Sequence, residues 1–527
     1  MNQQIYEQVN LFFNIRNLDL HDLAFEKQIV VVLKEKLENN YSKIIASSNQ
    51  VFGSKNIDFE FPFLLNYHFE RLQAFIIEVI NIKDRGDTSG RVIGKAHFDL
   101  GEVAGSPDCL KIYNLDDDVS KETGKIILRI EKTTKGISKR ITFTLNVGNI
   151  PKKGFLASQI SFVKIFRAVE SQGQSSNLWQ IVKETPSFEG KNISLGKLTL
   201  NSALLYKNDE KTKIKFEVWK FKENGSHYPL SFIELTINEM LSGKRSFRMS
   251  SVDGKNESAI EIEFIDFMAK EHFGFIDYLQ GNLNLLQHIS IDFTASNGNP
   301  KNSSSLHYMS NNKPNLYQQA IMAIGQILEF YNKSRFLIAN GFGAVVNNFG
   351  DTNHLFPLNI DTQNPVFDSF PSVFQAYTHT LSKIKLSGPT NFSPTIINAI
   401  QYAIEMSKTN PMSYLIVTIF TDGVISDLQQ TINQIVEASF HAISLIIVGI
   451  GKADFSAMEK LDGDKHPLYD SSGRKVMRDI VQFVPFEQLN NNPIKLREEV
   501  LAELPYQVED YMNANNIRPT INQNIQQ

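Results

Sequence analysis

The sequence lacks several features that define large protein classes. Its 527 residues contain one cysteine, Cys109, so no disulfide framework or zinc cluster can form within the chain, and we expect a reducing, cytosolic setting. The longest apolar runs, such as residues 442–450, fall well short of the roughly 20 residues that a membrane-spanning helix needs. Basic and acidic residues number 53 and 57, and this near balance argues against a nucleic-acid-binding protein.

Catalytic signatures are missing as well. The motifs HExxH, GxSxG and the P-loop do not occur. Gly449 and Gly451 follow an apolar run as in a dinucleotide-binding loop, but Asp454 occupies the third glycine position. We therefore expect neither an enzyme nor a small-molecule substrate. The opening residues MNQQIYEQ lack a signal-peptide pattern, so we expect membrane contact only through folded surfaces.

Hydrophobic patterning divides the chain into units. Early segments alternate apolar and polar residues, as from Val9 to Ile15, which is typical of antiparallel all-β sandwiches. Similar hexapeptides, EVINIK from Glu78 and EVWKFK from Glu217, indicate an internal repeat. Later segments alternate strand and helix patterns, which predicts an α/β doubly wound domain. The predicted units are two sandwiches, the α/β domain and a disordered tail, at residues 1–135, 136–266, 273–513 and 514–527.

The stretch ISIDFTASNGNP, residues 289–300, is the most informative. Alternating Ile and Ser lead to Asp292, and the sequence then turns polar and small, so a strand is predicted to end there. Asp292, Thr294 and Ser296 can converge above the carboxyl end of that strand, where open α/β sheets bind ligands. Oxygen ligands suit a hard cation such as Mg²⁺, although the same residues also fit an ordinary turn with a helix cap.

Two later stretches favour the metal. Thr390 lies in the loop SGPTNFSP ahead of a helical pattern, and Asp422 directly follows the apolar run YLIVTIFT. Because the carboxyl ends of parallel strands meet at one edge of a sheet, Asp422 is expected to reach the same point as Asp292.

Together the three loops resemble the metal-ion-dependent adhesion site of von Willebrand factor A domains, whose five positions are matched by Asp292, Thr294, Ser296, Thr390 and Asp422. More specifically, the chain resembles the copine family, through DFTASNGNP, NLYQQAI, GFGA, GPTNFSP, TDGVISD, IIVGIG, LDGD, RDIVQFVPF and VLAELPYQV. This resemblance implies two C2 domains followed by a von Willebrand A-like domain. We predict that Asp292, Ser296 and Thr390 hold Mg²⁺ or Mn²⁺, with Thr294 and Asp422 acting partly through water.

The family's C2 domains bind calcium through loop aspartates, and the first domain departs from that pattern. Ca²⁺ takes 6 to 8 oxygen ligands, and its affinity follows their charge. Gln28 and Asn81 stand where the family has aspartate. The carboxylates left near the loops are Asp19, Asp22, Asp84 and Asp87. Calcium binding at the first C2 domain is therefore doubtful.

The second C2 domain departs further. Gly154 and Ile160 replace two expected aspartates, and Lys220 and Lys222 occupy two more. Two ammonium groups repel a calcium ion by about 1 kcal/mol each at 4 Å even in water, so we expect no calcium binding there. Lys220 and Lys222 are either a solvated loop tip or a fixed positive patch that replaces the ion.

The resemblance implies a function for the whole chain. We predict a cytoplasmic protein that associates peripherally with the plasma membrane. Its C2 pair would bind anionic phospholipid, and its A domain would recruit protein partners whose carboxylate completes the coordination of the metal. The alternative is a cytosolic protein-interaction scaffold without lipid binding.

Overall fold

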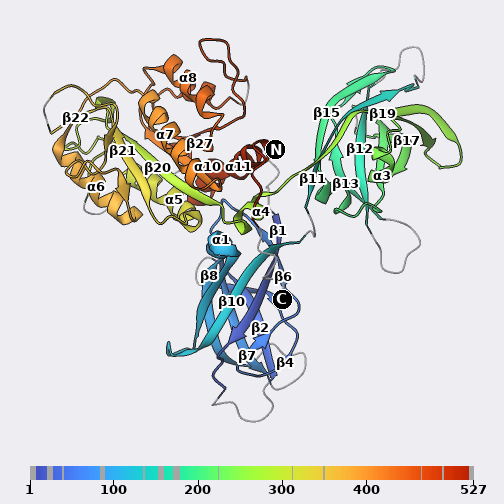
Figure 1. The fold of residues 1–527 in the computed structure, drawn as a ribbon, viewed down its shortest axis with the longest axis horizontal. Helices are drawn as coiled ribbons and strands as arrows, with labels where there is room; N and C mark the ends of the chain where they lie inside the picture. The colour runs from blue at the N-terminus through green and yellow to red at the C-terminus, as the bar shows by residue number, and fades with distance from the viewer. Residues whose placement is uncertain are drawn as a thin grey trace. The chain divides into compact units, whose positions relative to one another are not determined.

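The computed structural model of the chain contains three large β-sheets (Figure 1). The structure describes residues 7–20, 28–37, 41–82, 90–133, 137–151, 160–169, 178–223, 225–310, 313–347, 350–463, 466–489 and 492–520. The chain forms two compact units, of which one joins Met1–Thr133 to Phe275–Gln527 and the other is Thr134–Gly274. Within the described residues no helix is long and apolar enough to cross a membrane.

The first unit begins with an all-β sandwich made of one curled antiparallel sheet. Alternate residues of its first strand, from Val9 to Ile15, are buried, as the pattern predicts. Asp99 accepts a hydrogen bond from the Gly101 amide and so caps the short helix α1 (Leu100–Gly105). The strands are β1 (Glu7–Arg16), β2 (Gln28–Lys36), β3 (Ser42–Ser47), β4 (Val51–Phe52), β5 (Ile57–Asp58), β6 (Phe63–Tyr67), β7 (Ala74–Ile82), β8 (Arg91–Asp99), β9 (Leu110–Asp116) and β10 (Glu122–Lys132).

The second unit is another all-β sandwich. Its strands are β11 (Lys139–Gly148), β12 (Ile160–Val169), β13 (Leu178–Glu184), β14 (Phe188–Glu189), β15 (Ile193–Asn201), β16 (Ile214–Lys220), β17 (Tyr228–Leu235), β18 (Ser246–Ser251) and β19 (Glu257–Glu271), with short helices α2 (Ser202–Tyr206) and α3 (Ile237–Leu241). The strand order β13-β12-β16-β17-β18-β19-β11-β15 matches β3-β2-β7-β8-β9-β10-β1-β5 of the first sandwich position by position. Glu78 on β7 and Glu217 on β16 thus lie on equivalent strands. The prediction of two all-β sandwiches is confirmed.

The C-terminal part of the first unit is built on a mostly parallel sheet, of order β23-β21-β20-β26-β27-β28. Its strands are β20 (Asn284–Asp292), β21 (Leu337–Phe342), β23 (Phe356–Pro357), β24 (Val366–Phe367), β26 (Ser413–Thr421), β27 (Ile443–Gly449) and β28 (Val481–Pro485), beside the small hairpin of β22 (Ala344–Val346) and β25 (Ile384–Leu386). Its helices are α4 (Phe275–Gln280), α5 (Leu316–Tyr331), α6 (Phe370–Lys383), α7 (Ser393–Thr409), α8 (Leu428–Ala438), α9 (Ser456–Leu461), α10 (Pro493–Leu501) and α11 (Leu504–Ala514).

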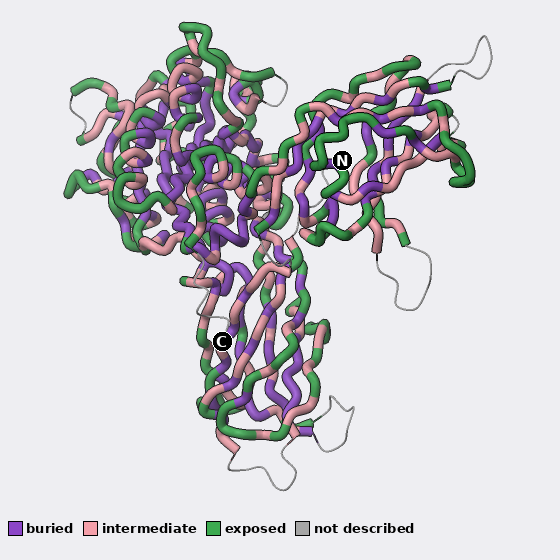
Figure 2. Tube along the Cα trace, turned by 45° about the vertical axis from the view of Figure 1, so that its right-hand side comes forward, coloured by how far each residue is buried: buried purple, intermediate pink, exposed green. Residues whose placement is uncertain are grey.

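Helices cover both faces of this sheet, and its central strands β20, β26 and β27 are buried at every residue. Figure 2 shows buried residues gathered in the interior of this part of the chain. Leu415 and Val417 of β26 share a core cluster with residues of α7 and α8. Tyr414 points to the opposite face and packs on Tyr511 of α11. Helical spacing of apolar residues over 496–513 predicts a single closing helix. The structure has two helices there, because Pro505 lies in the first turn of α11, where a proline starts a helix but cannot continue one.

The first sandwich and the C-terminal domain share buried contacts within their unit. The hydroxyls of Tyr67 on β6 and Tyr331 on α5 lie 2.6 Å apart, and the Phe69 ring packs against Tyr331. Lys132 on β10 forms an ion pair with Asp277 on α4 at 2.5 Å. Sequence patterning, which divides the chain at polar segments, contains no sign of this contact.

The packing of α1 on α5 leaves no room for a side chain at Gly105, since an added Cβ would lie 2.0 Å from the Phe330 carbonyl oxygen. We predict that Gly105→Ala lowers the free energy of unfolding of this unit by about 1 to 3 kcal/mol, the usual cost of overpacking. Both tryptophans, Trp179 and Trp219, lie in the other unit. In urea, the circular dichroism transition of the first unit should move while the tryptophan fluorescence transition stays. An unchanged circular dichroism transition in Gly105→Ala would contradict the close packing of α1 on α5.

Candidate functional site

The loops predicted to hold the metal meet at the point in the sheet where the strand order reverses. From β20 the chain passes to β21 on one side and later to β26 on the other, so the strand order reverses between β20 and β26. Loops diverge at such a point and leave a crevice beyond the carboxyl ends of the strands, where open α/β sheets bind ligands. Asp292 ends β20, and Asp422 follows the last residue of β26. The two aspartates therefore lie beyond the carboxyl ends of adjacent parallel strands.

All five predicted side chains belong to one hydrogen-bonded network. The Thr294 hydroxyl donates to Asp292 Oδ1 at 2.6 Å, and the Ser296 hydroxyl donates to Asp422 Oδ1 at 2.9 Å. Thr294 and Ser296 are themselves 2.9 Å apart, and the Thr390 hydroxyl lies 3.4 Å from that of Thr294. Four of the side chains are buried, and Ser296 is the exposed member. The structure thus brings together every residue predicted for the metal.

Neighbouring residues fix the loops that carry this network. The Thr390 carbonyl accepts a hydrogen bond from the Ser426 amide at 2.8 Å. Asp427 accepts hydrogen bonds from the amides of Phe392 and Ser393 at 3.0 and 2.9 Å, so it caps α7. Gly423 has to be small, because an added Cβ would lie 2.9 Å from the Thr390 hydroxyl. The motif TDGVISD therefore tethers the loop of Thr390 to the end of β26.

The two carboxylates have no cationic partner among the described residues. Burial raises the pKa of Asp292, and burial together with the charge of Asp292 raises the pKa of Asp422 to about 7. In the described part of the chain, neither aspartate forms an ion pair with a lysine or arginine. Two neighbouring acids without a counter-charge are an unfavourable arrangement in a buried crevice.

These residues fit a hard divalent cation. Because the protons of Thr294 and Ser296 are directed to carboxylates, the lone pairs of their oxygens stay available as ligands. Oxygen donors alone match Mg²⁺ and Mn²⁺. The described residues contain no group of three or more His, Cys, Asp or Glu that could hold a metal, so hydroxyls would have to complete the ligand set beside the two carboxylates.

Sequence reasoning missed three residues of the network. The Thr421 hydroxyl donates to Asp292 Oδ2 at 2.5 Å, and Asn297 donates from Nδ2 to Asp422 Oδ1 at 2.8 Å. His307 places Nε2 2.9 Å from the Asp292 carbonyl oxygen, and burial lowers the pKa of this imidazole to about 3. Thr421 could have been found as a hydroxyl at the end of an apolar strand. Nothing in the sequence connects His307 to Asp292.

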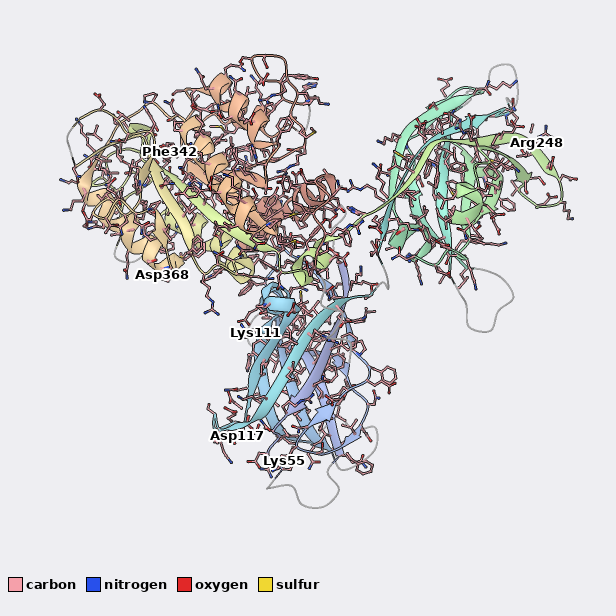
Figure 3. The ribbon with its side chains drawn as sticks, in the orientation of Figure 1. Lys55, Lys111, Asp117, Arg248, Phe342 and Asp368 are labelled. Carbon is pink, nitrogen blue, oxygen red and sulfur yellow. The ribbon has the colours of Figure 1, made fainter. Side chains whose placement is uncertain are left out.

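The loops of the first sandwich that are predicted to carry calcium ligands are described only in part. Asp22, Asp84 and Asp87 lie outside the described residues. Lys55 and Asp117 mark one end of the sandwich in Figure 3. Asp19 lies near that end, because the amide of the preceding residue, Leu18, donates to the Lys55 carbonyl. The Lys121 ammonium is 3.3 Å from Asp19 Oδ2. One of the four candidate carboxylates therefore already has a cationic neighbour.

The two lysines of the second sandwich differ in their surroundings. Lys220 ends β16 and is half-buried, and burial lowers its pKa, with Glu189 opposing the shift. Lys222 is exposed, and its ammonium lies 5.2 Å from the centre of the Tyr228 ring. Of the two other positions where the family resemblance predicts aspartate, Gly154 lies outside the described residues, and Ile160 begins β12.

A stripe of lysines and tryptophans crosses the same sheet. The Lys164 ammonium on β12 lies 4.4 Å from the centre of the Trp219 ring on β16, and that of Lys215 lies 4.6 Å from the centre of Trp179 on β13. Lys215 also pairs with Glu217 at 2.6 Å. The stripe is therefore amphipathic and only partly positive.

Comparison with known proteins identifies similar chains. The family profile described as Copine matches residues 305–520. The chain is 30% identical to Copine-B of Dictyostelium discoideum over 522 residues, which cover 96% of this chain and 95% of that protein. It is 31% identical to Copine-E of the same organism over 532 residues, covering 97% and 88%.

Solved structures of low similarity are also found. The structure titled "BON1-C2B" is 13% identical, with a TM-score of 0.22, and covers 26% of this chain and 94% of that one. A calcium-bound structure of the two C2 domains of Extended-Synaptotagmin 2 is 12% identical, with a TM-score of 0.25 and coverage of 50% and 99%.

The hydroxyl of Thr421 offers a test of the network without metal. We predict that Thr421→Val, which keeps the shape of the side chain, lowers the free energy of unfolding by about 1 to 3 kcal/mol, because a buried carboxylate loses a donor. Urea denaturation in chelator measures this loss. Thr418→Val is the matched control, because Thr418 is buried on the same strand and is not part of the network. Equal losses in the two variants would contradict the assigned hydrogen bond.

Proposed function

The chain belongs to the copine family, and on this premise we propose that it is a peripheral membrane protein that recruits protein partners. Its two sandwiches act as C2 domains on anionic phospholipid. Its C-terminal domain is a von Willebrand A-like module that binds Mg²⁺ or Mn²⁺. The protein works in the cytoplasm and at the plasma membrane, and its role is binding rather than catalysis.

The observation that carries the metal site is a network of two buried aspartates and three hydroxyls in which, among the residues that the structure describes, neither aspartate pairs with a lysine or arginine. Asp292, Ser296 and Thr390 hold the ion, while Thr294 and Asp422 orient them and contact it through water. A bound cation supplies an open coordination position for a carboxylate. A partner that presents an acidic side chain at the exposed Ser296 would therefore be captured there.

Lipid contact is assigned to fixed charge on the second sandwich. Lys220 and Lys222 stand in the loop region where the family's calcium ligands are expected, and the lysine and tryptophan stripe lies on the same sheet. Cations near an anionic lipid surface contribute about 1 kcal/mol each. Lipid binding by this sandwich is therefore proposed to need no calcium, whereas the first sandwich responds to calcium weakly if at all.

We expect Asp292→Ala to abolish binding of Mg²⁺ and Mn²⁺, because it removes the most buried oxygen ligand. Isothermal titration calorimetry of the full chain measures the binding. Asp454→Ala is the matched control, since Asp454 is an exposed aspartate in the loop after β27. The fold should survive, because apolar strands hold the sheet. The same binding heat in Asp292→Ala and the parent, or none in either, would exclude the metal site.

For lipid contact, we predict that the double variant Lys220→Asp, Lys222→Asp loses affinity for phosphatidylserine-rich vesicles in chelator. Loss of about 2 kcal/mol corresponds to roughly thirtyfold, and reversal of charge should cost at least this much. Co-sedimentation with vesicles measures it. The affinity of the parent should also fall between about 0.1 M and 1 M salt, as the Debye length shrinks from about 10 Å to 3 Å.

The double variant Lys207→Asp, Lys211→Asp controls for net charge. Both lysines are exposed and precede β16, so they lie at the other end of the strand from Lys220. This control should sediment like the parent. Equal sedimentation of the parent and the Lys220, Lys222 variant in chelator would make these lysines an ordinary solvated loop and would favour the lipid-free scaffold.

A further inference from the structure

The side-chain amide of Asn297 sits between the candidate metal site and helix α5. It is 2% exposed. Its Nδ2 donates to Asp422 Oδ1 at 2.8 Å, and its Oδ1 accepts a hydrogen bond from the Tyr317 hydroxyl at 2.7 Å. Tyr317 belongs to the first turn of α5 and is fully buried. A buried chain of hydrogen bonds thus runs from α5 through Asn297 to Asp422.

The Tyr317 ring is held independently of its hydroxyl. It stacks on His307 with ring centres 4.3 Å apart, and His307 stacks in turn on Phe293, which follows Asp292, at 5.2 Å. His307 is also fixed at both nitrogens, by the Asp292 carbonyl at 2.9 Å and the Tyr377 hydroxyl at 2.7 Å. Removal of the Tyr317 hydroxyl alone should therefore leave the ring in place.

We infer that Asn297 and Tyr317 are positioning residues that set the affinity of the A-domain site for its divalent cation. This inference rests on the proposed function, because it concerns the same site. Neither residue is assigned to contact the ion. Asn297 acts through Asp422, and Tyr317 acts through Asn297.

The physical reason is the orientation of an amide. Asn297 can present either its NH₂ group or its oxygen to Asp422, and only the NH₂ group donates to a carboxylate. The Tyr317 hydroxyl donates to the amide oxygen at 2.7 Å, and the Thr294 and Asp292 carbonyls accept from Nδ2 at 3.3 and 3.5 Å. Together they favour the orientation in which NH₂ faces Asp422, and the Tyr317 hydroxyl is the shortest of the three contacts. Without that donor the amide oxygen is buried without a partner, and the rotated amide would oppose its oxygen to the carboxylate. Asp422 Oδ1 would then lose one of its two side-chain donors and keep only the exposed Ser296 hydroxyl.

The test is Tyr317→Phe in the full chain, with Mn²⁺ titrated calorimetrically. Loss of an outer partner of a direct metal ligand costs about tenfold to a hundredfold in affinity. Because Asp422 reaches the ion through water, we expect a loss near the lower end of this range, about tenfold. Asn297→Ala should produce a loss at least as large. Tyr331→Phe is the matched control, because Tyr331 lies on the same helix, is equally buried and shares its own hydrogen bond with Tyr67. The control should bind Mn²⁺ like the parent.

Thermal unfolding in chelator separates positioning from stability. Tyr317→Phe and Tyr331→Phe should lose similar stability without metal, while only Tyr317→Phe should gain less stability than the parent when Mn²⁺ is added. Equal Mn²⁺ affinity in the parent, Tyr317→Phe and Asn297→Ala overturns the inference alone. Equal weakening in Tyr317→Phe and Tyr331→Phe also overturns it, since the effect would then be general to the packing of α5. Absence of Mn²⁺ binding in the parent overturns the proposed function and this inference with it.

Discussion

The buried meeting of Asp292 and Asp422 is the constraint on which the rest of the site depends. Adjacent parallel strands place their carboxyl ends at one edge of the sheet. Asp292 at the end of β20 and Asp422 directly after β26 must therefore lie close together. Burial and mutual repulsion raise the pKa of Asp422 to about 7. The loops around them must therefore supply hydrogen-bond donors to the carboxylates and leave no room for large side chains. This explains why Thr, Ser, Asn and Gly occupy these loops.

Sequence reasoning reached the parts of this arrangement that have local signals. Alternation of apolar residues predicted both sandwiches, and the spacing of Asp292 to Ser296 predicted a cluster above a strand end. The prediction of one helix over residues 496–513 was wrong, although Pro505 in the sequence marks the start of a second helix. Asn297 and Tyr317 could not be found in the same way, because their roles come from contacts between side chains on different elements. Such contacts leave no periodicity in the sequence.

The contacts at the two ends of helix α5 cannot be predicted from the hydrophobic pattern of the sequence. At 16 residues and 1.5 Å of rise per residue it spans about 24 Å. Its first turn carries Tyr317, which contacts the candidate site, and its last turn carries Tyr331, which contacts Tyr67 of the first sandwich. The spacing of Ala320, Ile324 and Leu328 in the sequence predicts an amphipathic helix with one buried face. Only the structure shows that one end of α5 contacts the candidate site and the other end contacts the first sandwich.

The two sandwiches have the same strand order, but their loops differ in charge. A calcium cage requires carboxylates whose charge is not already met, because affinity for the ion follows the charge of its ligands. Asp19 lies beside the Lys121 ammonium, so an ion at that position would compete with a charge that is already present. In the second sandwich, the positions predicted to carry calcium ligands hold Lys220 and Lys222, whose charge is positive. Under the proposed function, lipid contact by that sandwich is therefore set by fixed charges, and ionic strength rather than calcium concentration becomes the variable that controls it.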